Sequence, residues 1–272
     1  MRKYKLLILD IDGTIVTLGI KVSPRLIKTV KEVQKKGILV TLITGRMFRT
    51  SLPFVKQLNI TLPIICYQGA LIKNPLTQEL LFHEPLPFDL AKQLIEIAKK
   101  EGVHLNIYLN DVLYMTRPKI PEAFEYLKIE KQNKKTNYRY INLATYKLPG
   151  SPTKLIMISN KKHIDRIEKR LNRLFKNQIT TTRGFPNFLD FLKFGVSKGQ
   201  GLRIVADYLG IKKKEIISIG DYYNDISMFQ ESGFPIAVKN APSLVKKSAL
   251  FVTDSVEKDG AAKAIEKFLL KD

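Results

Sequence analysis

Short, unbroken apolar runs alternate with amphipathic segments at both ends of this 272-residue chain. Residues 5–11, 38–43 and 63–66 are rich in Leu and Ile without polar alternation, which is typical of strands buried on both faces of a parallel sheet. Between the first two runs, Ser23 and Pro24 provide a helix cap and a first helical residue. This order of strands and helices predicts an α/β fold with a doubly wound, Rossmann-like parallel sheet.

The alternation breaks off near residue 85 and returns near residue 197. Between these points, residues 89–100 predict a helix, and two short alternating segments on either side of Asn110 and Asp111 predict a β-hairpin. We therefore expect a discontinuous core of residues 1–84 and 188–272, and an inserted α+β domain of residues 85–187. The other expected elements are strands at 154–159, 178–182, 215–219 and 235–238, and helices at 164–175, 197–209, from 225 and at 256–270.

Composition places the chain among ordinary globular proteins. It is 44% hydrophobic and 26% charged, and it contains no run of about 20 apolar residues that could span a bilayer. The single cysteine, Cys66, cannot form an internal disulfide, as is usual in a reducing compartment. We expect a cytoplasmic protein without a membrane anchor, either a monomer or a weak homodimer.

Positive charge is the unusual bulk property, at a formal net charge of +21. Residues 119–176 hold 15 Lys and Arg against 5 Asp and Glu. A solvated basic surface is the favoured explanation. Attraction of an anionic substrate comes second, and a nucleic-acid site is the least favoured, because only Tyr138 and Tyr140 around Arg139 suggest aromatic residues interleaved with charge.

Two aspartates follow the first expected strand directly, in the sequence DIDGT of residues 10–14. Ligands of open α/β sheets gather beyond the carboxyl ends of strands, and alternate residues of an extended segment face the same side. Asp10 and Asp12 should therefore share a site, where a divalent cation with oxygen ligands, Mg²⁺ in particular, would relieve their repulsion. The alternative is a pair of turn-forming aspartates before Gly13.

Groups suited to phosphate follow at two later junctions. Thr44, Gly45 and Arg46 offer a hydroxyl, an approachable backbone N–H and a cation after the second expected strand. Lys198 opens a later helix in the sequence VSKG. Taken singly, each is more often a helix cap with a surface arginine, or a solvated lysine.

A second acidic segment, GDYYND at residues 220–225, follows the strand expected at 215–219. Together the four segments offer a nucleophile, a metal site and groups for phosphoryl oxygens, which is what phosphoryl transfer needs. The chain lacks GxxxxGK[ST] and GxGxxG, so neither an NTPase nor a dinucleotide enzyme is indicated.

In this order, DIDGT, TGR, the lysine of VSKG and GDYYND resemble the four motifs of the haloacid dehalogenase (HAD) superfamily. The long insertion and the sequence CYQGA at residues 66–70 resemble its Cof-type branch, in which the insertion is an α/β (type IIB) cap that selects the substrate. The resemblance spans the whole chain. It implies a Mg²⁺-dependent phosphatase for a small phosphorylated metabolite, such as a sugar phosphate, a nucleotide or a phosphorylated cofactor.

The resemblance also implies a role for each matched residue. Asp10 would be the nucleophile that becomes an aspartyl phosphate, and Asp12 the general acid and base. Arg46 would either contact substrate or lie on the surface. Thr44, Gly45, Lys198 and Asn224 would bind the phosphoryl group, and Asp10, the Asp12 carbonyl oxygen, Asp221 and, in support, Asp225 would hold Mg²⁺.

Two departures from the family pattern, at Gln68 and at the variable position Tyr222, and two alternatives accompany this interpretation. The branch usually has Asn where this chain has Gln68, which puts the leaving-group contacts of that loop in doubt. A phosphomutase or phosphotransferase could use the same core chemistry. A basic nucleic-acid-binding protein with a vestigial core is the alternative from another class, although the intact motifs count against it.

Overall fold

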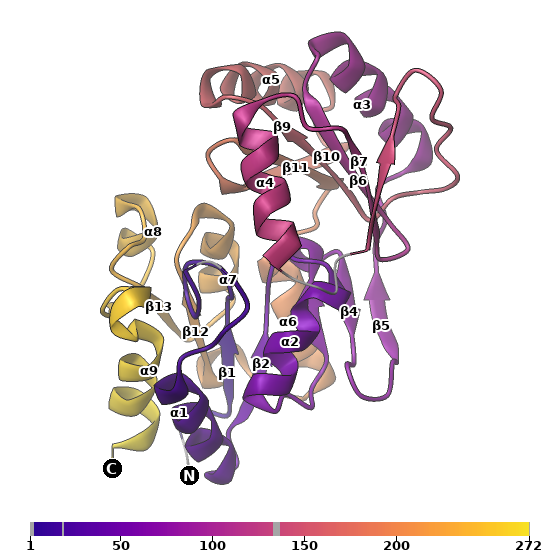
Figure 1. Ribbon diagram of the computed structural model, residues 1–272. Coiled ribbons are helices and arrows are strands. Elements are labelled where there is room, and N and C mark those ends of the chain that lie inside the picture. The colour runs from indigo at the N-terminus through magenta and orange to yellow at the C-terminus, as the bar shows by residue number, and fades with distance from the viewer. Residues whose placement is uncertain (1–2, 18, 133–136, 272) are drawn as a thin grey trace. The chain divides into compact units, whose positions relative to one another are not determined.

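The computed structural model describes residues 3–17, 19–132 and 137–271 (Figure 1). The chain divides into two compact units, one formed by Met1–Phe82 with Ser197–Asp272 and the other by His83–Val196. The boundary expected at residues 187 and 188 falls within a hairpin of strands β10 (Ile179–Phe185) and β11 (Phe188–Lys193). The second unit therefore continues to Val196.

A five-stranded parallel sheet forms the centre of the first unit, in the order β14-β13-β12-β1-β2. Strand β1 (Leu6–Leu9) lies between β12 (Ile216–Gly220) and β2 (Leu39–Leu42) and is buried along its whole length. Its side chains alternate, so that Leu6 and Ile8 belong to the apolar cluster of one face. The predicted α/β fold with a parallel sheet is confirmed.

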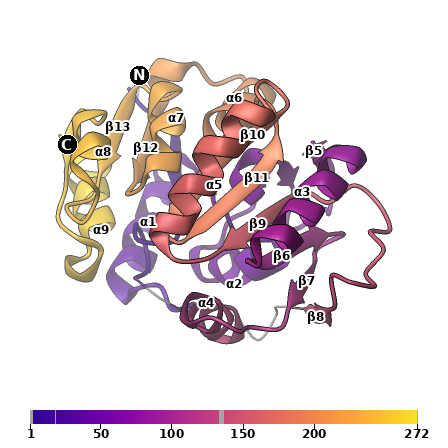
Figure 2. The ribbon, with the colours of Figure 1, turned by 90° about the horizontal axis from the view of Figure 1, so that it is seen from above.

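Helices cover both faces of this sheet (Figures 1 and 2). Helix α1 packs against α9, and α6 packs against α7. As predicted, Ser23 caps α1, because its hydroxyl accepts the Leu26 N–H. The helices of this unit are α1 (Pro24–Lys35), α2 (Phe48–Leu58), α6 (Lys198–Tyr208), α7 (Ile226–Gln230), α8 (Ser243–Lys247) and α9 (Gly260–Ile265), which a π-helical turn (Glu266–Leu270) extends.

The expected third parallel strand belongs to a different sheet. Strand β3 (Ile64–Cys66) pairs antiparallel with β4 (Leu71–Lys73), and an isolated bridge from Ile43 to Ile65 joins it to the parallel system. The tight turn at Tyr67–Gly69 returns the chain at once and makes this pairing possible. The remaining strands of the unit are β5 (Leu80–His83), β13 (Phe234–Ala237) and β14 (Phe251–Val252).

The second unit is built on a six-stranded sheet in the order β10-β11-β9-β6-β7-β8. The predicted hairpin is present, and Asn110 and Asp111 adopt the positive φ angles, 52° and 57°, that its tight turn requires. Residues of α3 and α5 share an apolar cluster with the middle strands. The elements are α3 (Phe88–Glu101), β6 (His104–Leu109), β7 (Val112–Thr116), α4 (Pro121–Gln132), β8 (Tyr138–Ile141), β9 (Lys154–Ile158) and α5 (Lys161–Leu174), besides β10 and β11.

Within the described residues, every helix is too short or too polar to cross a membrane.

Candidate active site

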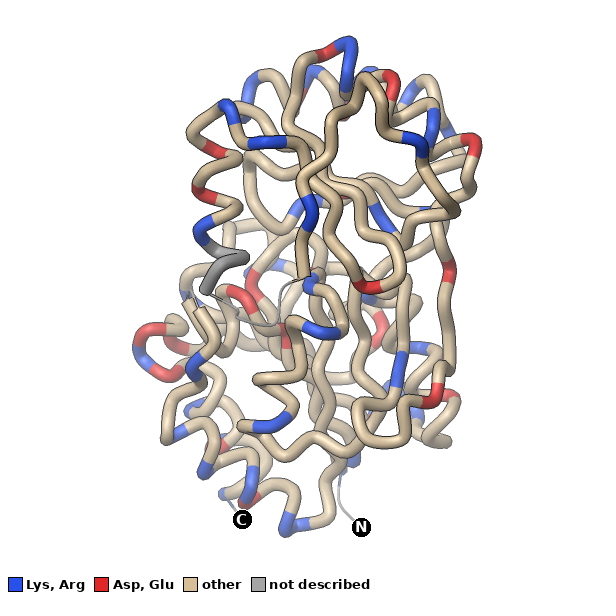
Figure 3. The backbone as a smooth tube through the Cα atoms, turned by 45° about the vertical axis from the view of Figure 1, so that its right-hand side comes forward, with Lys and Arg blue, Asp and Glu red and all other residues tan. Residues whose placement is uncertain are grey.

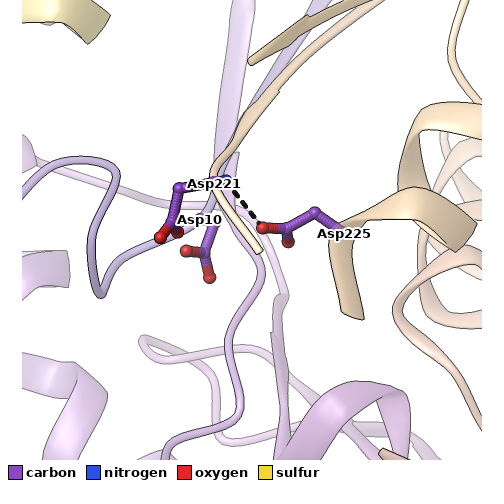
Figure 4. Close-up of side chains that lie close together, drawn as sticks. All are labelled: Asp10, Asp221 and Asp225. Carbon is purple, nitrogen blue, oxygen red and sulfur yellow. Dashed lines mark hydrogen bonds between the residues drawn. The ribbon is translucent and has the colours of Figure 1, made fainter. Parts of the chain in front are cut away.

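The carboxyl end of β1 positions the first aspartate of the sequence motif. The backbone N–H of Asp10 donates to the carbonyl oxygen of Ile219 in β12, 3.0 Å away. Because β1 and β12 are parallel neighbours, their carboxyl ends meet, and the residue after β12 is Asp221. Two acids from distant parts of the chain thus share one edge of the sheet (Figure 4).

Three carboxylates converge at this edge. Oxygen atoms of Asp10, Asp221 and Asp225 all lie within 4.8 Å of one another. The Thr14 hydroxyl links two of them, at 3.1 Å from an Asp10 oxygen and 3.0 Å from an Asp221 oxygen. This approach also requires Gly13, where a Cβ atom would lie 2.1 Å from Asp221 Oδ2 and where φ is +81°.

One buried lysine faces the cluster. Lys198 Nζ donates to Asp10 Oδ1 and to Asp225 Oδ1, both at 2.6 Å, and the lysine side chain is only 1% exposed. Burial alone would lower the pKa of Lys198, but the Asp10 and Asp225 carboxylates outweigh it and hold that pKa above its usual value. The lysine is therefore a permanent cation.

A single lysine does not balance the three carboxylates, of which Asp10 and Asp225 are buried and Asp221 is half-buried. Burial raises the pKa of Asp10 to about 7, although Lys198 opposes the shift. Burial, reinforced by Asp10 and Asp225, raises the pKa of Asp221 to about 9. The missing positive charge and an all-oxygen donor set fit a hard divalent cation.

The three acids differ in their freedom to bind a metal. One oxygen of Asp225 accepts the backbone N–H groups of Asp221 and Tyr222, at 2.8 and 2.9 Å, and the other accepts Lys198. Asp225 thus fixes the loop that carries Asp221. Asp10 and Asp221 are the residues whose carboxylates would hold the ion.

Asp12 lies apart from this cluster and faces Arg46. The guanidinium donates to both carboxylate oxygens, through Nε at 2.7 Å and Nη2 at 2.5 Å. It also donates to the Gly19 carbonyl oxygen and lies over the Phe54 ring, 4.8 Å from its centroid. Arg46, which the sequence left between substrate contact and surface, is thereby a clamp on the Asp12 carboxylate.

The second motif supplies a buried hydroxyl and a close backbone contact. Thr44 Oγ1 accepts the Arg46 backbone N–H at 3.1 Å, and it can still donate its own hydrogen. A Cβ atom on Gly45 would lie 2.5 Å from Gln68 Nε2, so a larger residue at position 45 would require the Gln68 amide to shift. Asn224 Nδ2 in turn donates to Gln68 Oε1 at 2.9 Å.

Asn224 retains one unused acceptor. Its Oδ1 is buried and has no hydrogen-bond partner within the described residues. A buried amide oxygen without a donor is costly, and it could accept from a donor group of a ligand but not from a phosphoryl oxygen.

The structure thus arranges the expected site residues in three groups. In the first group, Lys198 contacts Asp10 and Asp225, and Asp225 contacts the Asp221 backbone. In the second, Thr44 contacts Arg46, which contacts Asp12. In the third, Gly45 lies against Gln68, which contacts Asn224. Thr14, the last residue of DIDGT, was not among the expected site residues.

Comparison with known proteins covers nearly the whole chain. The profile of the haloacid dehalogenase-like hydrolases matches residues 7–265. The 5-amino-6-(5-phospho-D-ribitylamino)uracil phosphatase YitU of Bacillus subtilis is 27% identical over 98% of each chain. A haloacid dehalogenase-like hydrolase from Bacteroides thetaiotaomicron superposes with a TM-score of 0.84, at 29% identity, covering 97% of this chain and 99% of that one. A phosphatase of the HAD superfamily from the same organism gives a TM-score of 0.80 at 26% identity, over 97% of this chain and 95% of that one.

Proposed function

The chain belongs to the haloacid dehalogenase-like hydrolase family, and on that basis we propose that it is a Mg²⁺-dependent phosphatase acting through an aspartyl phosphate on Asp10. The observation that carries the proposal is the position of the Asp10 carboxylate, at the end of the central strand beside two further carboxylates and Lys198. Such a site offers an oxygen nucleophile together with charge to stabilise a phosphoryl group.

In the first step, a carboxylate oxygen of Asp10 attacks phosphorus, and the bond from phosphorus to the ester oxygen breaks. Asp12 gives a proton to the departing alcohol. Arg46 grips both oxygens of Asp12 and so fixes the direction in which that carboxyl group points. The Thr44 hydroxyl, the Gly45 N–H, Lys198 and the second Nδ2 hydrogen of Asn224 would bind the phosphoryl oxygens.

In the second step, Asp12 takes a proton from water, the water oxygen attacks phosphorus, and the bond to Asp10 breaks. Inorganic phosphate leaves and the Asp10 carboxylate is restored. Mg²⁺ on Asp10, Asp221 and the Asp12 carbonyl oxygen would supply positive charge for the phosphoryl oxygens when it is bound. The contacts among Asp10, Lys198 and Asp221 count against a vestigial core and hence against the nucleic-acid alternative.

We infer that the substrate is a small phosphate monoester and that the inserted unit acts as the cap that selects it. Support comes from relatives such as YitU, whose substrate is a phosphorylated ribityl compound. Sugar phosphates, nucleotides and 5-amino-6-(5-phospho-D-ribitylamino)uracil therefore belong in one panel of test substrates.

The test is phosphate release from this panel in Mg²⁺, in Ca²⁺ and in chelator. Turnover should require Mg²⁺ and fall in Ca²⁺, because Ca²⁺ accepts both oxygens of one carboxylate and would occupy the attacking oxygen of Asp10. Asp221→Asn should lose activity, whereas the control Asp254→Asn, which removes an acid paired with Lys263 instead, should not. Equal turnover in chelator would contradict the metal requirement.

A further inference from the structure

A cavity lies within the inserted unit. Its volume is about 650 Å³, within the range of roughly 300–1,000 Å³ common for small-molecule sites. It is enclosed by the end of α3, the start of β6, the end of β7 with the segment that follows, and β8 with the loop after it. In Figure 2 that loop runs beside α3. None of the lining residues belongs to the candidate active site.

The charge of the lining has one sign. Lys99, Arg117 and Lys119 contribute to the wall, and no Asp or Glu does. Arg117 and Lys119 form no ion pair with any described residue, and the nearest acid to Lys99 Nζ is Glu96 at 4.0 Å. An anionic ligand would provide the missing counter-charge.

Basic residues are not confined to the cavity wall. Lys and Arg occur along both units (Figure 3), but elsewhere in the inserted unit many of them have acidic partners. Arg183 binds Asp165 and Glu168, and Lys154 binds Asp190. Others, such as Lys162 and Lys169, form no ion pair with a described residue either, so Arg117 and Lys119 are distinguished by lining the cavity.

The same cavity offers surface for a flat ring. Tyr140 is 39% exposed, and the Arg117 guanidinium lies over its ring, 4.9 Å from the centroid. A planar ligand can stack on either of these flat groups. Val103, Ile141 and Leu143 supply apolar wall beside them.

The buried histidine of the wall adds no charge. His104 uses one ring nitrogen toward Asn106 and the other toward Thr116, at 3.0 and 2.9 Å. Burial lowers the pKa of His104 to about 4, so the imidazole is neutral at ordinary pH. The positive charge of the wall therefore comes from its lysines and its arginine.

From these features we propose that the inserted unit binds a small organic anion that joins a phosphate group to a planar ring, the chemistry of a mononucleotide. The phosphate would be bound by Lys119, Lys99 and Arg117, and the ring would lie against Tyr140. This is a binding site only, and no bond is made or broken there. The proposal goes beyond the proposed phosphatase activity and does not depend on it.

The absence of tryptophan from the chain makes a direct test possible. Tyr140→Trp keeps an aromatic ring in the wall and introduces one tryptophan, which can be excited selectively beside the tyrosines. The probe is the phosphonate analogue of AMP, which has a carbon in place of the ester oxygen and cannot be hydrolysed as an ester. We expect a saturable change in tryptophan fluorescence, and calorimetry on the unmodified chain should show the same binding. Adenosine and methylphosphonate, which each carry half of the chemistry, should bind at least about tenfold more weakly.

Two double variants decide whether the cavity is responsible. Arg117→Ala with Lys119→Ala should weaken binding about tenfold or more. Lys162→Ala with Lys169→Ala removes the same charge from α5, outside the cavity, and should leave binding within about twofold. Equal weakening by both pairs would reduce the effect to general electrostatics and overturn the proposal. So would the absence of saturable binding by calorimetry, or binding of methylphosphonate as tight as that of the analogue.

Discussion

Replacing Lys198 by methionine tests the electrostatic balance of the site. The substitution keeps most of the side-chain volume but removes a buried cation that contacts Asp10 and Asp225 at 2.6 Å each. Breaking a buried ion pair by removing one partner costs about 3–5 kcal/mol, because the remaining charge loses its compensation. For a protein of this size, that corresponds to a melting temperature lower by roughly 6–20 °C.

The cost should depend on pH and on Mg²⁺. It should be largest in chelator near pH 9, and it should shrink near pH 5.5, where Asp10 and Asp221, whose pKa values are raised to about 7 and 9, hold protons. Mg²⁺ should restore part of the loss, since it supplies positive charge to the same carboxylates. Urea denaturation and thermal melting, with and without Mg²⁺, measure both effects.

A second buried ion pair provides the matched control. Lys154 and Asp190 are about as buried as Lys198 and its partners, but they lie in the inserted unit. Lys154→Met should also destabilise the protein, yet Mg²⁺ should not rescue it. A loss below about 1 kcal/mol for Lys198→Met, or equal rescue of both variants by Mg²⁺, would refute the reasoning.

Three further predictions concern the aspartates. In chelator, the free energy of unfolding should fall as pH rises from about 4.5 to 9. The reason is that the pKa values of Asp10 and Asp221 are raised, so that the folded state holds protons that the unfolded state has lost. Urea denaturation at several pH values measures this fall, and Asp221→Asn should make it less steep. Asp12→Asn should slow hydrolysis of alkyl phosphates about 10²–10⁴-fold and of nitrophenyl phosphate far less, since a nitrophenolate leaves without a proton; equal losses in a steady-state comparison would remove Asp12 from the acid role. Arg46→Lys replaces the two hydrogen bonds from the guanidinium to Asp12 by one contact, and it should lower kcat/KM about tenfold with little change in melting temperature. Unchanged kinetics would show that Arg46 does not position Asp12.

The parallel core was predictable because its sequence pattern and its burial agree. Strand β1 is an unbroken apolar run and is buried along its whole length, as a strand covered by helices on both faces must be. Helix α1 carries both a cap and an apolar stripe. The acidic motifs could be placed together because parallel strands bring their carboxyl ends to one edge.

The elements that escaped prediction lack a local pattern of this kind. Helix α2 contains Pro53, which argues against a helix in sequence although it lies within the second turn here. Helix α4 and the short strand β8 lie in a basic stretch whose apolar positions are sparse, and β8 is fixed by pairing with β7. Strand β11 pairs with β9 and β10, so its place in the inserted unit is decided by tertiary pairing and not by local sequence.

Within the site, the sequence indicated which residues belong to it, but it did not indicate every contact that those residues make. Motif order brought Asp10, Lys198 and Asp221 to one place. It did not show that Arg46 turns toward Asp12, because a guanidinium at a strand end can reach several partners and the choice depends on Gly19 and the Phe54 ring.

The central claim is that phosphate passes through a covalent bond to Asp10. The most direct measurement is to quench the enzyme with borohydride during turnover and to find the modified residue by peptide mass spectrometry, since borohydride reduces an acyl phosphate and converts aspartate to homoserine. We predict homoserine at position 10 in the active enzyme, more of it in Asp12→Asn, where hydrolysis of the intermediate is slowed, and none in Asp10→Asn. Homoserine at position 12, or full turnover without any modified aspartate, would contradict the proposed mechanism.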